Sequence, residues 1–140
     1  MPQPIAYLSF NGNCVEAMRF YEQALDGKLE AVIRNADTPW ADQTPPEDRQ
    51  CVVHARLVLD GNGILYGGDC PPAMGYEGIK GVSLTLNYDT VEQARRVFGA
   101  LSEGGTVTMA MQPAFWAKQW GMLVDRFGTP WIVNGEPIPF

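Results

Sequence analysis

Residues 125–134, DRFGTPWIVN, contain a turn between two apolar segments and form the most informative stretch of the chain. Residues 121–126 before the turn are interpreted as a strand that points alternately into and out of an apolar face, and the apolar residues 131–133 return after the turn. Two such segments around a turn that contains Gly128 and Pro130 predict a β-hairpin. We expect this hairpin to complete a sheet.

Three tryptophans, Trp116, Trp120 and Trp131, fall within sixteen residues of one another around this hairpin. Each ring covers a large apolar area and carries one polar N–H group. The rings therefore either pack against the sheet or line a ligand cavity, and the sequence leaves both interpretations open.

The residues before the hairpin predict a strand, a helix and another strand. Thr90 and Gln93 have the spacing of a capping box, and apolar residues recur at helical spacing up to Leu101. Gly104 follows as a stop signal. Strands are predicted over 82–88 and 106–111.

The N-terminal half predicts the same order of elements. Asn13 is expected to cap a helix whose apolar residues recur at helical spacing, and Gly27 to end it. The predicted segments are strands over 5–10, 29–34, 54–60 and 64–68, a helix over 14–25, and a long exposed loop over 35–50.

The two halves repeat one pattern. A shift of about 77 positions places Ile5 on Val82 and Gly27 on Gly104, whereas the hairpins differ by about 67 positions. The loop over 35–50 accounts for the difference. The fold class is therefore α+β, with two βαβββ modules forming curved mixed sheets: module one at 5–69, a linker at 70–79 and module two at 80–135. Since neither module buries both faces of its sheet, we expect them to pair around a cavity, within one chain or between two.

Composition excludes several classes of protein. The formal charge of −6 and the absence of a basic run argue against nucleic acid as a partner. No apolar run approaches the roughly 20 residues that span a bilayer, and the first residues do not resemble a signal peptide. We therefore expect a cytoplasmic protein without a membrane partner. Three cysteines without CxxC spacing are expected to be reduced thiols.

The duplicated pattern resembles the vicinal oxygen chelate superfamily, which includes glyoxalase I, extradiol dioxygenases and bleomycin-binding proteins. Several separated motifs resemble its PhnB-like subgroup in particular, and together they span nearly the whole chain. These motifs are Tyr7-Leu8-Ser9-Phe10-Asn11-Gly12-Asn13-Cys14, Phe20-Tyr21, His54-Ala55, Phe115-Trp116-Ala117, Asp125-Arg126-Phe127-Gly128 and Pro130-Trp131-Ile132-Val133-Asn134.

The resemblance implies where a divalent metal would bind. Metal-dependent members take two His or Glu ligands from each module, near the start of its first strand and on its last strand. The corresponding positions here are about Ala6 and Ser83 on the first strands, and Tyr66 or Gly67 and Ile132 on the last. None has a His or Glu side chain, so we predict no metal ion and no other cofactor.

Candidate site residues lie on the first strand, at the start of the first hairpin and before the last one. By alternation Tyr7 and Ser9 share a strand face, and with His54 they are predicted to hydrogen-bond a ligand. His54 is either a general base or a structural histidine. Phe115, Trp116 and Trp120 are predicted as an apolar lid, with residues 115–119 as a moving flap.

Three charged residues have alternative roles. Lys118 either binds an anion or is a solvated surface residue. Asp69 either faces the cavity as a base or weak ligand, or is a solvated turn residue. Asp125 is expected in the turn that closes the last hairpin.

Two functional hypotheses remain, with a third possibility. The first is a metal-free protein that binds a small, partly aromatic or apolar molecule. The second is a divergent enzyme of the superfamily, either a lyase, isomerase or dioxygenase with a metal held by a displaced set such as His54, Asp69 and Asp125, or a metal-free acid/base catalyst using His54 or Tyr7. The third is a protein whose main role is association, and a homodimer would cover the sheet edges. Methyltransferase activity, which a label of the subgroup suggests, is not expected, because no glycine-rich loop follows the first strand.

Overall fold

The computed structural model describes residues 2–139 and divides the chain into two compact units, one ending at Gly78 and one beginning at Ile79. The predicted modules at 5–69 and 80–135 fall one in each unit. Each unit has a four-stranded sheet and one α-helix, so the α+β class with duplicated βαβββ modules is confirmed. Within residues 2–139, no helix combines the length and apolar character that a membrane span requires.

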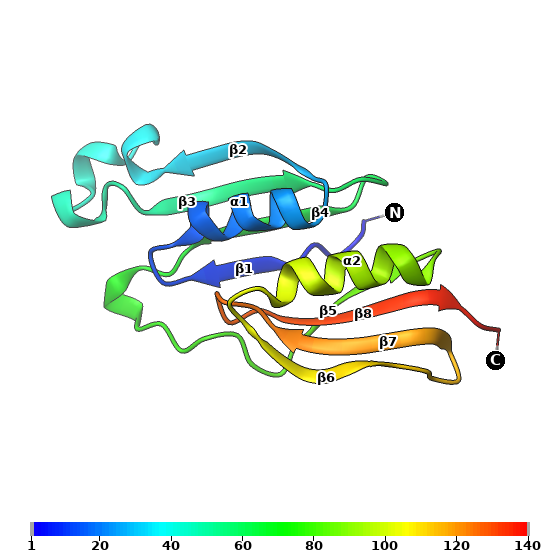
Figure 1. Cartoon of the computed structure of the whole chain (residues 1–140). Helices are drawn as coiled ribbons and strands as arrows, with labels where there is room; N and C mark the ends of the chain where they lie inside the picture. Colours follow the sequence, from blue (N-terminus) through cyan, green and yellow to red (C-terminus); the bar gives the residue numbers. More distant parts are fainter. Residues whose placement is uncertain (1, 140) are drawn as a thin grey trace. The chain divides into compact units, whose positions relative to one another are not determined.

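The first unit contains a mixed sheet with strand order β1-β4-β3-β2 (Figure 1). β1 runs parallel to β4, whereas β3 is antiparallel to both of its neighbours. Helix α1 covers one face of the sheet and buries Met18 and Tyr21, and the Tyr21 ring lies 6.3 Å from that of Phe10 on β1. The elements are β1 (Tyr7–Phe10), α1 (Cys14–Ala24), β2 (Lys28–Arg34), β3 (Val52–Val58) and β4 (Ile64–Asp69).

Asp69, at the end of β4, organises the start of α1. Its carboxylate accepts hydrogen bonds from the backbone N–H of Cys14 and of Val52, each at 2.9 Å. The side chain of Asn13, which was predicted to cap this helix, instead accepts from Asn11 N. Both oxygens of Asp69 thus satisfy backbone donors that a helix start and a strand start leave unpaired, a structural role that neither of the two interpretations from the sequence included.

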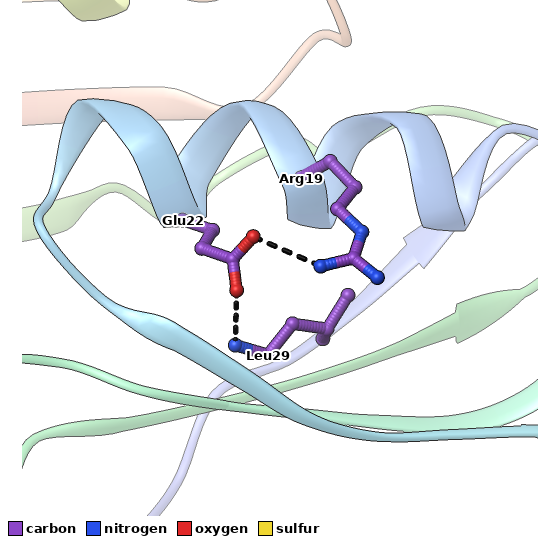
Figure 2. Close-up of polar contacts among 3 residues, drawn as sticks. All are labelled: Arg19, Glu22 and Leu29. Carbon is purple, nitrogen blue, oxygen red and sulfur yellow. Dashed lines mark hydrogen bonds and ion pairs between the residues drawn. The ribbon is translucent and has the colours of Figure 1, made fainter.

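The end of α1 is fastened to β2 through Glu22 (Figure 2). Its carboxylate accepts from Leu29 N at 2.7 Å and pairs with Arg19 Nη1 at 3.0 Å. These two contacts, the backbone hydrogen bond first, lower the pKa of the Glu22 carboxyl. The turn between helix and strand has its left-handed residue at Asp26, with φ of 52°, and not at the predicted stop, Gly27.

The segment between β2 and β3 is an ordered insertion. Instead of the long loop predicted over 35–50, it forms three 3₁₀ helices, η1 (Asn35–Asp37), η2 (Ala41–Gln43) and η3 (Pro46–Asp48). Asn35 holds it together: its amide nitrogen donates to Asp48 O at 2.9 Å, and its amide oxygen accepts from Trp40 Nε1 at 3.1 Å. Asn35 N also donates to Cys51 O, which closes the insertion at its base.

Tyr7 crosses the sheet face that α1 leaves uncovered. Its hydroxyl donates a 2.6 Å hydrogen bond to Val53 O, at the point where a bulge in β3 leaves Val53 without a partner on β2. The ring passes over Gly68 of β4, where a Cβ atom would collide with the Tyr7 hydroxyl. The bulge therefore supplies a free carbonyl, and the glycine supplies the space to reach it.

The second unit repeats this architecture with strand order β5-β8-β7-β6 (Figure 1). Thr90 caps α2 as predicted, with Gln93 N donating to Thr90 Oγ1 at 3.2 Å, but the Gln93 side chain accepts from the Thr90 hydroxyl and not from the backbone N–H that a full capping box uses. β5 is parallel to β8, and the predicted last hairpin is the antiparallel pair β7 and β8. The elements are β5 (Leu84–Tyr88), α2 (Val91–Ser102), β6 (Thr106–Gln112), β7 (Ala117–Val124) and β8 (Pro130–Pro137).

The turn between β7 and β8 is built on Asp125, as predicted. This residue is only 4% exposed, and its carboxylate accepts from the backbone N–H of Phe127 and Thr129 and from the indole Nε1 of Trp131. Trp131 itself is 1% exposed. Among the three clustered tryptophans, Trp131 is therefore a core residue.

The predicted repeat aligns the two halves by a single shift of about 77 positions, without a gap. In the structure, the first strand of the second unit is offset by one residue from that alignment, relative to its helix. In the first unit, Leu8 and Phe10 face the helix. In the second unit, Leu86 and Tyr88 do so, because their partners on β8, Val133 and Gly135, lie on the face that packs against α2. The connection between strand and helix is one residue longer in the first unit. Since side chains alternate along a strand, this single residue exchanges the two faces in a gapless alignment.

Replacing Glu22 by glutamine is expected to lower stability in a pH-dependent way. A lowered carboxyl pKa means that the stabilisation is complete above the ordinary value of 4.5 and is lost as pH falls through the folded-state value. The melting temperature of Glu22→Gln should lie below that of the unmodified protein at pH 7, and the gap should close under acid conditions. Exposed Glu47 provides the control variant, Glu47→Gln. A gap of constant size from pH 7 to pH 3 would contradict this account.

Gly68→Ala is expected to destabilise the first unit by about 1–3 kcal/mol, the usual cost of overpacking, because the new methyl group displaces the Tyr7 hydroxyl. In a Tyr7→Ala background the same change should cost distinctly less. Urea unfolding of the two single variants and the double variant measures this coupling. Additive effects of the two changes would show that Tyr7 does not occupy the space over Gly68.

Candidate functional site

The candidate residues form two clusters, one in each unit, on the sheet faces that the helices do not cover. In the first unit this free face carries Tyr7, Ser9 and His54; in the second it carries Trp120, with Trp116 beside it. The predicted cavity between the modules stays a prediction.

In the first unit, His54 lies among tyrosine rings. Its ring centroid is 4.7 Å from that of Tyr66 and 6.2 Å from that of Tyr7. Tyr7 and Tyr66 are direct partners in the parallel pairing of β1 and β4. Tyr66 was not among the predicted ligand-binding residues, although its position on the same alternating face could have identified it.

The hydroxyl of Tyr7 is poorly suited to act as a base. Burial, followed by the charges of Cys14 and Asp69, raises the pKa of Tyr7 above its ordinary value. The hydroxyl also donates its proton to Val53 O. Tyr7 therefore presents a neutral ring, 48% exposed, beside His54. Ser9 is exposed two residues along on the same face.

In the second unit, Trp116 and Trp120 form an aromatic pair supported by two amides. The indole rings lie 5.1 Å apart at 55°. Trp116 Nε1 donates to Asn134 Oδ1 at 3.1 Å, and Asn134 Nδ2 donates to Asn87 Oδ1 at 2.9 Å. Trp120, Asn134 and Asn87 occupy one row across β7, β8 and β5. Sequence reasoning missed both asparagines, although Asn134 ends the stretch that predicted the hairpin.

The structure does not bear out the predicted moving flap over 115–119, because most of this segment is part of strand β7. Residues 117–119 belong to this strand, with Ala117 opposite Pro137 and Gln119 opposite Gly135. The backbone of Trp116 accepts from Ile138 N at 2.9 Å, so this residue is fixed through both its backbone and its indole. Phe115 packs edge-on against Trp116 at 4.8 Å and is 69% exposed.

Lys118 forms an ion pair with Glu136 across β7 and β8, at 2.5 Å. Both side chains are substantially exposed. The exposure of Lys118 agrees with a solvated surface residue, one of the two roles considered from the sequence, and binding of an anion stays a prediction. A negatively charged ligand would have to compete with Glu136 for this lysine.

A small cavity of about 130 Å³ lies in the first unit, between the insertion and the end of β4. Its lining includes Asn35, Asp48, Cys51 and Asp69. Burial and the charges of Asp69 and Asp48 raise the pKa of Cys51. All three cysteines are free, and burial and Asp69 raise the pKa of the Cys14 thiol to about 12. Since thiolates are the nucleophilic form, Cys14 and Cys51 are poor nucleophiles.

The residues at the superfamily's metal positions do not fit a divalent ion. The positions expected from the resemblance, about Ala6, Ser83, Tyr66 or Gly67 and Ile132, carry no His or Glu. At or next to them on the free face, the first and last strands of each unit pair Tyr7 with Tyr66, and Thr85 with Ile132. None of these four side chains is an imidazole or a carboxylate, the ligands that such ions require. Within residues 2–139, no three His, Cys, Asp or Glu side chains gather into a group that could hold a metal ion. The displaced set of His54, Asp69 and Asp125 is not such a group. The absence of a metal from the protein remains a prediction.

Comparison with known proteins gives concordant results. The family model described as 3-demethylubiquinone-9 3-methyltransferase matches residues 2–134. Protein YjdN of Escherichia coli (strain K12) is 32% identical over 136 residues, which cover 91% of each chain. The solved structure of protein PA1353 from Pseudomonas aeruginosa is 46% identical, with a TM-score of 0.86 over 96% of this chain and 97% of that one.

More distant structures share the fold. The PhnB protein of Bacillus cereus is 24% identical, with a TM-score of 0.75 over 95% of this chain and 98% of the other. A glyoxylase/bleomycin resistance protein/dioxygenase domain from Frankia sp. EAN1pec is 15% identical, with a TM-score of 0.68 over 96% and 98%. The resemblance inferred from the motifs is thus confirmed. The chain belongs to the family described as 3-demethylubiquinone-9 3-methyltransferase, the PhnB-like family with the glyoxalase/bleomycin-resistance fold.

Proposed function

We propose that this protein binds a small molecule with an aromatic or apolar part on the free face of its second sheet, without a metal ion. The observation that carries the proposal is the pair of Trp116 and Trp120, held beside an amide at Asn134. Both rings are partly exposed, whereas Trp131 of the same hairpin is buried. A ligand ring stacked on an indole gains about 0.5–1.5 kcal/mol beyond the burial of its area.

Fixation of these rings supports a binding role. The indole of Trp116 is tied to Asn134, and its backbone to Ile138. Trp120 lies in the middle of β7, directly opposite Asn134. Because the aromatic surface is already ordered, a ligand loses little free energy to ordering the protein on binding.

A metal-free acid/base reaction at His54 is the second candidate function. The observation in its favour is the contact of the His54 ring with Tyr66 and Tyr7 on an uncovered sheet face. Imidazole titrates near neutrality and is the usual general base of such a reaction. In this alternative Tyr7 orients the substrate and does not remove a proton, because its pKa is raised and its hydroxyl is engaged.

We do not propose methyl transfer, although the family description names it. The connection between β1 and α1 is Asn11-Gly12-Asn13, which has one glycine. A nucleotide-type cofactor bound at that position would require a glycine-rich loop opening the helix. The first backbone N–H of α1 is moreover already bonded to the carboxylate of Asp69.

We further propose that the protein is a cytoplasmic homodimer. The edge strand β6 has no charged residue and no proline, and it exposes Val107 by 45% and Met109 by 37%. An apolar edge of this kind is a ready site for pairing with another strand. A second copy of the chain is the simplest partner, because most soluble oligomers are symmetric homodimers.

The binding proposal is tested through the four tryptophan side chains of the protein. Their indole N–H signals are followed by two-dimensional NMR during addition of neutral aromatic fragments, after assignment with single Trp→Phe variants. The signals of Trp116 and Trp120 should move, while those of buried Trp131 and of Trp40 in the insertion should stay in place. Failure of every fragment to move Trp116 or Trp120 would refute the proposal.

The dimer proposal is tested by light scattering of the purified protein and of Met109→Lys. The unmodified protein should have the mass of two chains, and the new charge on β6 should shift the equilibrium toward one chain. Glu47→Lys, a charge change in the insertion, serves as the control. A monomeric mass for the unmodified protein would exclude the dimer.

A further inference from the structure

The hydrogen bonds behind the tryptophan pair form a chain with a fixed direction. It runs from Trp116 Nε1 to Asn134 Oδ1, and from Asn134 Nδ2 to Asn87 Oδ1. An indole N–H can only donate, so the group of Asn134 that faces it must be the amide oxygen. The nitrogen of Asn134 then faces Asn87, whose own oxygen must accept. The direction of both amides, usually ambiguous, is determined here by one tryptophan.

This series of hydrogen bonds therefore ends in a donor, the amide nitrogen of Asn87. Of the two polar atoms of the Asn87 amide, the oxygen is engaged by Asn134, and the nitrogen remains. In the part of the chain that the structure describes, no hydrogen bond involves this nitrogen. Asn87 is exposed, so its two N–H groups are available to a ligand.

The aromatic surface and the free donor lie in one row of the sheet. Trp120 is opposite Asn134 on one side, and Asn87 is beside Asn134 on the other. The row spans two strand spacings, about 10 Å. A planar molecule of one or two fused rings that rests on Trp120 can thus reach Asn87 with a substituent on its edge.

The neighbouring charges favour a neutral ligand. Lys118 lies two residues before Trp120, and Glu136 two residues after Asn134, on the same face of β7 and β8. These two residues pair with each other. The charge of Lys118 is thus matched before any ligand arrives, and a carboxylate on the ligand would lie near Glu136.

We propose that the ligand is a neutral planar aromatic molecule bearing a carbonyl oxygen, stacked on Trp120 with that oxygen accepting a hydrogen bond from Asn87 Nδ2. This inference rests on the proposed binding function and adds the polarity of the recognised group. Asn87 is the specificity-determining residue, and Trp116 is a positioning residue that acts through Asn134.

The experiment compares two probes that differ only in the carbonyl, 1-indanone and indane. Binding to the full-length protein is measured from the indole signals of Trp116 and Trp120, for the unmodified protein and for Asn87→Asp. The unmodified protein should bind 1-indanone about five-fold more tightly than indane, as one net hydrogen bond predicts. In Asn87→Asp, a carboxylate oxygen replaces the free N–H₂ group, and the preference for the ketone should vanish while the affinity for indane stays within about two-fold.

A third variant separates positioning from contact. Trp116→Phe removes the indole donor that fixes the direction of the amides, so the ketone preference should shrink, with the readout taken from Trp120 alone. Thr85→Val, a change on the same face of β5 outside the row, is the control and should preserve the preference. Thermal melting verifies that each variant is folded.

Each outcome of the probe comparison has a distinct meaning. Equal affinities of the unmodified protein for the two probes would overturn this inference while leaving the binding function in place. A ketone preference that persists in Asn87→Asp would overturn it as well. If neither probe moves the signals of Trp116 or Trp120, the binding function and this inference fail together.

Discussion

Each sheet of this protein has a single helix, on one face only, and this constraint decides which side chains are buried and which lie on the free face. Because successive side chains of a strand point to opposite faces, burying Leu8 and Phe10 under α1 directs Tyr7 and Ser9 to the other face. The same alternation in the second unit separates the buried Trp131 from the amide of Asn134. The sheets therefore divide their residues into a structural set and a set available for binding.

The two units use equivalent places on the free face for different chemistry. If the pairing of β3 with β4 is continued by one residue, His54 lies beside Gly68. This pair corresponds to Trp120 beside Asn134 in the second unit. In the first unit, Gly68 stands where the second unit has Asn134, and the ring of Tyr7 occupies the space that a side chain would take. In the second, Asn134 fills the place itself and connects Trp116 to Asn87. A duplicated scaffold has thus acquired one tyrosine-rich and one tryptophan-rich surface.

Most of the fold could be predicted from the sequence, because helical spacing around Tyr21 and strand alternation around Leu8 are local signals. Contacts between distant residues could not. Asp69 caps a helix 55 positions earlier in the chain, and Asn134 meets an indole 18 positions before it. Such partners depend on strand register, which a one-residue difference between the repeats was enough to alter. The face that Tyr7 and Ser9 share was predictable; the amides that orient Trp116 were not.

The insertion between β2 and β3 is closed by its own hydrogen bonds. Asn35 and Ala36 at its beginning bond to Cys51 and Arg49 at its end, so the two strands meet at a fixed separation whatever lies between. Its length and composition are thereby uncoupled from the register of the sheet. Relatives of this chain can consequently lengthen, shorten or exchange this segment during evolution while keeping the same scaffold, and it offers engineers a position for grafting a foreign peptide.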